Sequence, residues 1–431
     1  MSREMKDSGI PWIGEIPQSW DIKTLGVFFR ENTKDNHALV STNSLQYKYG
    51  EIIQKPNNDR ELNEQDIDLL KKYTLVKPDD IVVNGLNLNY DFNSLRIARV
   101  KENGIITSAY IVIRPMFEEN SSFFNYLLKS LDYQKVFHGM GTGIRLTLKF
   151  KELSRMSLPI PPTIFEQTLI ADYLDKKCAE IDKLIGLQEK MIDKLTTYKQ
   201  SVITEAVTKG LDPNVNMKDS GVEWIAKIPE HWDMCRVKNI CCQNSNVLSE
   251  KENSNFEFDY VDIGSVSFEK GIFNTEHYIF KNAPSRARRK AKVGDLIMST
   301  VRTYLKAIDV IDNDEKAKYI YSTGFAILTP KPQVYFKFLS YISKSQYFLD
   351  QVVTSSKGIN YPSINSQDLM KIYVITAPKS EQQSIADYLD KKCSEIDRMI
   401  EIKKEKIEKL NTYKKSIIFE YVTGKKEVPH A

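Results

Sequence analysis

Residues 166–182 read EQTLIADYLDKKCAEID and residues 381–397 read EQQSIADYLDKKCSEID, so one stretch occurs twice in the chain, 215 positions apart. The likeness continues through KLTTYK at 194–199 and KLNTYK at 409–414. A second duplicated segment precedes each copy: MKDSGIPWIGEIPQSWD begins at residue 5 and MKDSGVEWIAKIPEHWD at residue 217, and eleven of their seventeen positions agree. Two long matches in the same order at nearly one spacing predict a chain built from two copies of one unit.

The first duplicated stretch has the heptad pattern of a coiled-coil helix. Residues 166–207 contain no proline, and apolar side chains recur there at spacings of three and four, as they do in the second copy. A stripe this narrow does not stabilise a lone helix, so each helix needs a partner. We expect the two copies to pair antiparallel, because one chain supplies both, and about 30 paired residues make a rod of roughly 45 Å. Two unrelated surface helices are the alternative. The heptad positions expected at the helix contact are Leu174, Ile181, Ile185, Ile192, Leu195, Leu389, Ile396, Ile400, Ile407 and Leu410.

Proline and glycine mark the ends of both helices. Pro161 and Pro162 precede the first helix, Pro378 precedes the second, and Gly210 and Gly424 follow their ends, as helix-stop glycines do. The predicted organisation is an N-terminal segment with a first globular domain at 1–162, a first long helix at 163–209, a linker, repeated segment and second globular domain at 210–378, a second long helix at 379–424, and a tail at 425–431.

The two stretches between the duplicated segments, residues 22–160 (lobe 1) and 234–376 (lobe 2), differ strongly in sequence. In both, short β-branched runs alternate with Gly and Asn turns and a few helical patches. Short echoes link the two lobes, at 80–83 with 295–298 and at 108–113 with 323–328. We therefore predict an α+β chain: two globular α/β domains separated by two long antiparallel coiled-coil helices, with an internal pseudo-two-fold repeat.

Composition and motifs argue against a catalytic centre. The 61 basic and 57 acidic residues leave a net charge of +4, so overall charge indicates no partner. The sequence has no P-loop, no Gly-rich nucleotide fingerprint and no amino-methyltransferase motif, and its five histidines have no catalytic spacing. His231 with Cys235, Cys241 and Cys242 fits no common zinc module. We predict no catalytic, cofactor-binding or metal-ligating residues.

The sequence also gives an expectation of location. No run of about 18 apolar residues is present, so no transmembrane helix is expected, and residues 1–10 lack the apolar stretch of a signal peptide. Five scattered cysteines, an odd number, favour reduced thiols over a disulfide framework. These features predict a cytoplasmic protein.

Basic residues cluster between 281 and 306, where eight Lys or Arg stand against one acid, Asp295. Such a patch suits phosphate contacts, because each cation that neutralises a phosphate releases counterions; Arg suits guanine edges and Asn suits adenine. The stretch 84–101 is its counterpart in lobe 1, and the loops 141–145 and 355–361 are a second pair. A lone Arg or Asn in a loop is more often solvated or a turn former, so the patch as a whole carries more weight than any one residue. The candidate DNA-binding residues are Asn84, Asn87, Asn89, Arg96, Arg99, Arg145, Arg286, Arg288, Arg289, Lys290, Arg302, Lys306, Lys357, Asn360 and Tyr361.

Each repeated segment carries two tryptophans, Trp12 and Trp20 in the first and Trp224 and Trp232 in the second. Since most such aromatics anchor a loop in a core, we expect the same packing against the helix ends in both copies.

These motifs resemble the specificity subunits of type I restriction-modification systems. The resemblance lies in Leu158-Pro159-Ile160-Pro161-Pro162 followed by Glu166-Gln167-x-x-Ile170-Ala171-x-x-Leu174, and in Ala377-Pro378 followed by Glu381-Gln382-x-x-Ile385-Ala386-x-x-Leu389. The second copy lacks the double proline. The pattern SG-x-x-WI-x-x-IP-x-x-W at 8–20 and 220–232 is also similar to that family, so the likeness spans the whole chain in order.

The resemblance implies a DNA-recognition subunit without catalysis of its own. Two target-recognition domains would each read one half of a split DNA sequence, and the long helices would form the spacer between them. Two methyltransferase (modification) subunits would methylate adenine with S-adenosylmethionine, and separate restriction subunits, which are translocase-nucleases, would use ATP and magnesium. A coiled-coil interaction protein and an orphan DNA-binding regulator of the same fold are the alternatives.

Overall fold

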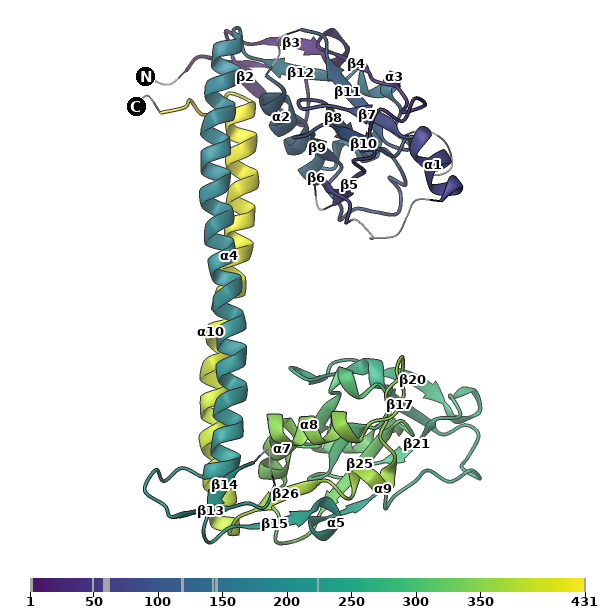
Figure 1. Ribbon diagram of the computed structural model, residues 1–431, viewed down its shortest axis with the longest axis vertical. Helices are drawn as coiled ribbons and strands as arrows, with labels where there is room; N and C mark the ends of the chain where they lie inside the picture. The colour runs from purple at the N-terminus through teal and green to yellow at the C-terminus, as the bar shows by residue number, and fades with distance from the viewer. Residues whose placement is uncertain are drawn as a thin grey trace. The chain divides into compact units, whose positions relative to one another are not determined.

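The computed structural model describes residues 3–48, 50–56, 63–117, 120–141, 143, 146–222 and 225–429. The chain divides into two compact units, residues 1–188 with 405–431 (unit 1) and residues 189–404 (unit 2). Each unit contains one lobe and a segment of each of two long helices, α4 (Ile164–Lys209) and α10 (Lys379–Val422) (Figure 1). None of the helices in these described ranges is long and apolar enough to cross a membrane.

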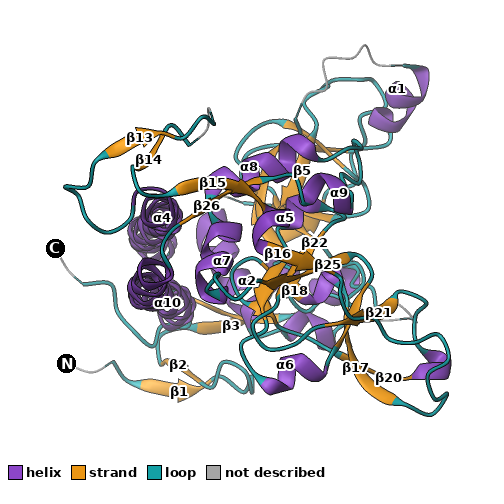
Figure 2. Ribbon diagram, turned by 90° about the horizontal axis from the view of Figure 1, so that it is seen from below, coloured by secondary structure: helices purple, strands orange, loops and turns teal. Residues whose placement is uncertain are grey.

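The two long helices pair antiparallel within each unit (Figures 1 and 2). In unit 1 the first part of α4 lies beside the last part of α10, where Lys414 Nζ donates to both carboxylate oxygens of Asp182 at 2.6 and 2.7 Å. In unit 2 the last part of α4 lies beside the first part of α10, and Lys199 Nζ donates to both oxygens of Asp397 at 2.7 Å. These residues are equivalent in the duplicated sequence, so one ion pair forms twice. The predicted antiparallel pairing and pseudo-two-fold repeat are confirmed.

The heptad side chains turn toward the interior in both units. Leu174, Ile181, Leu389 and Ile396 are buried. The remaining predicted positions, all half-buried, are Ile185, Ile192, Leu195, Ile400, Ile407 and Leu410. Both helices end before a glycine with left-handed backbone, Gly210 (φ +75°) and Gly424 (φ +72°), a conformation that glycine adopts without steric cost.

Lobe 1 is built on the antiparallel sheet β4-β11-β8-β9. In β8, Ile81 and Val83 face the core shared with helix α2, while Val82 faces a second core on the other side of the sheet. Both faces of the sheet are therefore covered, which explains why β8 is a continuous run of β-branched residues. The strands of unit 1 are β1 (Met5–Asp7), β2 (Glu15–Pro17), β3 (Asp21–Thr24), β4 (Phe29–Glu31), β5 (Leu45–Lys48), β6 (Glu51–Gln54), β7 (Thr74–Val76), β8 (Ile81–Val83), β9 (Ile97–Arg99), β10 (Gly104–Ile106), β11 (Ile111–Pro115) and β12 (Ser157–Ile160). Its shorter α-helices are α1 (Glu64–Lys71), α2 (Ser121–Tyr133) and α3 (Phe150–Leu153).

Lobe 2 repeats this sheet as β16-β25-β22-β23. Its second sheet, β20-β17-β24-β21, corresponds to the strand pairs β5-β6 and β7-β10 of lobe 1, where Ser44 and Ile105 form a parallel bridge. The echo between 80–83 and 295–298 is thus the shared central strand, β8 in one lobe and β22 in the other. The strands of unit 2 are β13 (Met217–Asp219), β14 (Lys227–Pro229), β15 (Asp233–Arg236), β16 (Cys241–Gln243), β17 (Glu257–Val261), β18 (Val266–Ser267), β19 (Gly271–Ile272), β20 (Glu276–Ile279), β21 (Ala287–Lys290), β22 (Leu296–Ser299), β23 (Ile308–Val310), β24 (Ile320–Ser322), β25 (Phe325–Pro330) and β26 (Tyr373–Thr376). Its shorter α-helices are α5 (Val237–Ile240), α6 (Asp314–Lys318), α7 (Phe336–Lys344), α8 (Gln346–Ser355) and α9 (Ser366–Leu369).

The repeated tryptophan segments fasten each lobe to the start of a long helix. Trp20 and Trp232 are fully buried; the indole N–H of Trp20 donates to Glu166 Oε1 at 3.1 Å, and that of Trp232 to Glu381 Oε2 at 2.9 Å. The segments therefore pack against the helix ends, as predicted from the sequence. Trp12 is partly buried against the same core, and Trp224 lies outside the described residues.

Candidate nucleic-acid interface

Two loops of lobe 2 that the sequence singled out separately meet in the structure. One follows β22 and covers residues 300–306; the other follows α8 and covers residues 356–363. Val301 forms a β-bridge with Ser363, the Thr303 N–H donates to the Pro362 carbonyl at 3.2 Å, and the Ile364 N–H donates to the Thr300 carbonyl at 2.9 Å. The stretch with Arg302 and Lys306 and the stretch with Lys357, Asn360 and Tyr361 thus form one surface.

This surface presents cations beside aromatic rings. The exposed Arg302 guanidinium lies 5.2 Å from the ring centroid of Tyr361, and Lys306 Nζ lies 5.5 Å from that of Phe268. Lys357, Asn360 and Tyr361 are exposed. Within the described part of the chain, no acidic side chain forms an ion pair with Arg302, Lys306 or Lys357. The cations remain available to an anionic ligand.

The backbone of the first loop is held in an uncommon conformation. Arg302 (φ +50°) and Lys306 (φ +48°) both adopt the left-handed region, which residues other than glycine adopt uncommonly. Together they bracket the short turn Thr303–Leu305. The turn therefore holds Arg302 and the exposed ring of Tyr304 in fixed positions at the surface.

The basic run at 286–290 is the edge of the second sheet of lobe 2. Arg286 is exposed, and Arg288 stacks over Phe280 at 5.2 Å. Arg289 is half-buried, and burial lowers its pKa. Lys290 is half-buried on β21. The pairing of this strand with β24 shifts register between Ala287 and Arg289, and the role of the run in DNA binding stays a prediction.

In lobe 1 the structure corrects the assignment of Arg96 to DNA contact. Arg96 is 1% exposed, and its guanidinium donates to the carbonyls of Asn84 at 3.1 Å, Leu86 at 2.8 Å and Asp91 at 2.7 Å. Those bonds hold the loop between β8 and β9 together. Arg96 is therefore a structural residue that faces no ligand, and its assignment to DNA contact is wrong.

The other lobe 1 candidates lie in or beside the same loop. Asn84 accepts the Leu86 N–H at 3.2 Å, as a turn former does, and Asn87 is exposed with φ +51°. Asn89 is half-buried. Arg99 is paired with Asp79 at 3.4 Å. Arg145 falls outside the described residues.

The comparison with known proteins decides the family. The profile of the type I restriction modification DNA specificity domain matches twice, at residues 17–197 and 229–412. The chain belongs to this family. These two matches cover both lobes and both long helices, and members of the family recognise the DNA target of a type I restriction-modification system.

Curated relatives of this specificity subunit match along most of its length. The type I restriction enzyme MjaVIII specificity subunit of Methanocaldococcus jannaschii is 24% identical over 426 residues, which cover 95% of this chain and 93% of the relative. The EcoKI specificity subunit of Escherichia coli K12 is 22% identical over 442 residues, which cover 95% and 90%. A solved structure from a study of complex assembly and conformational transition of the type I R-M system is similar with a TM-score of 0.69 at 15% identity, over 94% of this chain and 98% of that one, which shows the shared fold.

Exposed apolar side chains also lie in the loops of the specificity subunit, and those of lobe 1 were not predicted from the sequence. In lobe 1 the loop between β8 and β9 presents Tyr90 and Phe92, and the Phe92 ring stacks on His138 at 4.7 Å. In lobe 2 the joined loops present Tyr304 and Ile359, the latter 99% exposed. The signal was available, since polar and apolar residues alternate at 87–92 (Asn-Leu-Asn-Tyr-Asp-Phe), but exposure depends on the folded loop.

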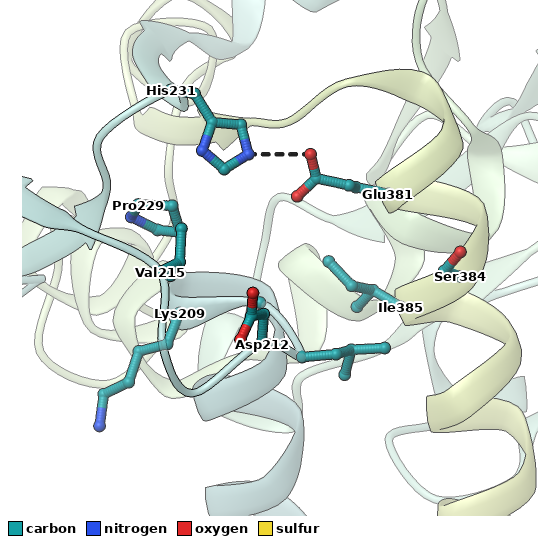
Figure 3. Close-up of a pocket in the computed structure, with 10 residues that line it drawn as sticks. Lys209, Asp212, Val215, Pro229, His231, Glu381, Ser384 and Ile385 are labelled. Carbon is teal, nitrogen blue, oxygen red and sulfur yellow. Dashed lines mark hydrogen bonds and ion pairs between the residues drawn. The ribbon is translucent and has the colours of Figure 1, made fainter.

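A cavity of about 290 Å³ in unit 2 lies where the linker leaves α4 and α10 begins (Figure 3). His231 Nε2 lies 2.8 Å from Glu381 Oε1 across its rim. His231 thus takes part in the attachment of the tryptophan segment to α10. Within the described ranges, no group of three or more His, Cys, Asp or Glu side chains is arranged to hold a metal ion.

Proposed function

We propose that this specificity subunit reads a split DNA target with one loop surface in each lobe. The observation that carries the proposal is the junction of the 300–306 and 356–363 loops in lobe 2, which gathers unpaired cations, an amide and exposed rings. A guanidinium fork suits the edge of guanine and an Asn amide that of adenine, while lysine suits phosphate. In lobe 1 the loop held by Arg96 would serve the same purpose with Asn87, Tyr90 and Phe92.

The proposal includes two partner subunits that carry the chemistry. Leu184 and Leu187 of α4 are exposed in unit 1, and their sequence equivalents Met399 and Ile402 of α10 are exposed in unit 2. Apolar side chains three residues apart lie on one face of a helix, so the repeat offers two equivalent apolar stripes. This supports the binding of two copies of one modification subunit.

In this proposal the specificity subunit performs no catalysis. The modification subunits would bind S-adenosylmethionine and methylate adenine in each half of the target. Restriction subunits with ATP and magnesium would add cleavage. The specificity subunit would determine where on the DNA both activities act.

Arg302→Ala tests the base-reading role. Loss of one bidentate arginine contact costs about 1–3 kcal/mol, so binding of the target duplex should weaken roughly 5- to 150-fold and discrimination should relax at one base pair. Arg236→Ala is the matched control, since Arg236 stacks over Tyr373 at the same 5.2 Å but lies on β15, outside the joined loops. The measurement is equilibrium binding of the assembled complex to the target and to duplexes altered at each position.

Two results would change this assignment. An equal loss on every sequence would make Arg302 a phosphate contact. Unchanged binding would remove the joined loops from the DNA interface.

A further inference from the structure

Each lobe contains one helix with the pattern Phe-x-x-Tyr-x-x-Lys-Ser, at 123–130 and 338–345. The two copies are separated by the same 215 positions as the long helices, although the lobes otherwise differ. In α2 the Tyr126 hydroxyl donates to Asp175 Oδ1 of α4 at 2.7 Å. In α7 the Tyr341 hydroxyl donates to Asp390 Oδ1 of α10 at 2.6 Å. The tyrosine therefore fastens each lobe to a long helix in the same way.

The lysine of the pattern lies on the same face, one turn further along the helix. Lys129 and Lys344 are both half-buried. Neither ammonium group has an ion-pair or hydrogen-bond partner among the residues that the structure describes. Each thus holds a positive charge at the junction of a lobe with the long helices, and no acidic side chain there is paired with it.

Acidic and basic side chains both lie near these lysines, and after burial the acidic one has the larger effect on each pKa. Burial lowers the pKa of Lys129, and the nearby Lys414 acts in the same direction. Burial likewise lowers the pKa of Lys344, and Lys199 acts in the same direction. Glu51 near Lys129 and Asp309 near Lys344 oppose these shifts without forming an ion pair with either lysine. Lys414 and Lys199 are equivalent in the repeat, so the same electrostatic arrangement forms in each unit.

A partly buried cation without a counter-charge is destabilising. Two lobes with different sequences nevertheless keep it at equivalent positions, where Gln or Leu would pack at lower cost. The same lysine in two otherwise different lobes indicates a common function, and its positive charge indicates an anionic ligand.

In unit 2 a cleft lies beside this junction. Its volume is about 680 Å³, and it is lined from α4 by Thr196, Thr197 and Gln200 and from lobe 2 by residues that include Tyr304 and Lys306. Gln200 donates its side-chain N–H to the carbonyl of Lys344 at 2.6 Å. Hydroxyl, amide and ammonium donors of this kind bind phosphate oxygens. Tyr304 and Lys306 also belong to the joined loops, so the cleft extends from the proposed DNA surface to Gln200, which contacts the backbone of Lys344; Glu269 is also part of its lining.

We propose that Lys129 and Lys344 bind backbone phosphates of the DNA duplex, one in each half of the target. The inference rests on the proposed DNA-reading function and adds to it. These contacts fix the position of each lobe on the backbone and carry no base specificity. The pseudo-two-fold repeat places one such contact in each unit.

The salt dependence of DNA binding tests this assignment. The assembled complex of the full chain with its modification subunits is titrated with target duplex and with random-sequence duplex over a series of salt concentrations. Lys129→Gln and Lys344→Gln should each lower the slope of log K against log salt by about 0.9, and the double variant by about 1.8. Affinity should fall by the same factor on both duplexes. Lys129→Arg and Lys344→Arg should retain the slope.

Exposed lysines of the same lobes serve as controls. Lys151 on α3 and Lys318 on α6 are exposed, and their replacement by Gln should leave the slope unchanged. A thermal denaturation curve for each variant verifies that it is folded.

The possible failures are distinguishable. If the wild-type complex does not bind DNA, the proposed function fails. If it binds and the Lys→Gln variants keep the wild-type slope, the phosphate assignment is overturned while the function stands. Failure of the folded Lys→Gln variants to assemble with the modification subunits would also overturn it, because the lysines would then serve assembly.

Discussion

Equivalent substitutions in the two lobes should change stability in opposite directions. Asp80 is 0% exposed, and Arg114 Nε and a terminal guanidinium nitrogen donate to its two oxygens at 2.7 and 2.6 Å. In lobe 2 the equivalent carboxylate is Asp295, 3% exposed, and Thr329 stands at the position of Arg114. Burial raises the pKa of Asp295, and the opposing effects of the Lys292 N–H, the Thr329 hydroxyl and the Lys292 charge are smaller. One lobe therefore has a compensated buried carboxylate and the other does not.

Asp295→Asn should stabilise unit 2 at neutral pH. A folded-state pKa above the unfolded value means that the group's contribution to stability is fully present below the unfolded pKa of about 3.9 and is lost as pH rises through the folded pKa. The amide removes this loss and can still accept the Lys292 N–H, which lies 2.9 Å from the carboxylate. We therefore expect a gain in stability at pH 7 and almost none near pH 4, where the carboxyl group is protonated in the folded state.

Asp80→Asn should destabilise unit 1. It leaves the Arg114 cation, whose side chain is 18% exposed, without its carboxylate. Breaking a buried pair from one side costs about 3–5 kcal/mol, and the partial exposure of Arg114 reduces this to about 2–3 kcal/mol. For units of about 200 residues, 1 kcal/mol shifts Tm by about 2–4 °C.

Calorimetry at pH 7 and pH 4.5, together with hydrogen exchange of peptides from β8 and β22, measures both effects and assigns them to a unit. The reasoning is refuted if the two substitutions shift stability in the same direction, or if the gain from Asp295→Asn is as large at pH 4.5 as at pH 7.

Two further predictions concern how the target is read. Exchange of residues 22–160 for the lobe of another specificity subunit should change one half of the recognised sequence, as read by methylation mapping; a change in both halves would contradict independent reading. Insertion of four residues into each of α4 and α10 adds about 6 Å of helix and should lengthen the unread gap by roughly two base pairs. A target with an unchanged gap would show that the helices do not set it.

The sequence predicted the fold well because its evidence was periodic and duplicated. The heptad pattern of the long helices and the proline and glycine residues at their ends are local signals. The packing of the two helices agrees with these signals. The second sheet of lobe 2 was not predicted, because its strands are short and pair with partners far apart in the chain. The division of the chain into units was also beyond the sequence, since each unit takes its helix segments from distant parts of the chain.

The candidate site was harder to predict because exposure is a tertiary property. Arg96 is of a residue type that suits DNA contact, yet its guanidinium donates to three carbonyls of its own loop. Arg302 and Tyr361 are 59 positions apart and meet because backbone contacts join their loops, among them the bridge between Val301 and Ser363. Lys129 and Lys344, in contrast, could be matched in the sequence, because the spacing of the repeat separates them. Their burial and their lack of an ion-pair partner became apparent only in the structure.

The central claim is that this chain directs DNA methylation to a split sequence, and a modified-base map of the source genome with and without its gene tests it most directly. The account predicts that deletion abolishes adenine methylation at one bipartite, gapped motif and that the wild-type gene restores it. An unchanged map in cells that express the chain together with its modification subunits would contradict the account.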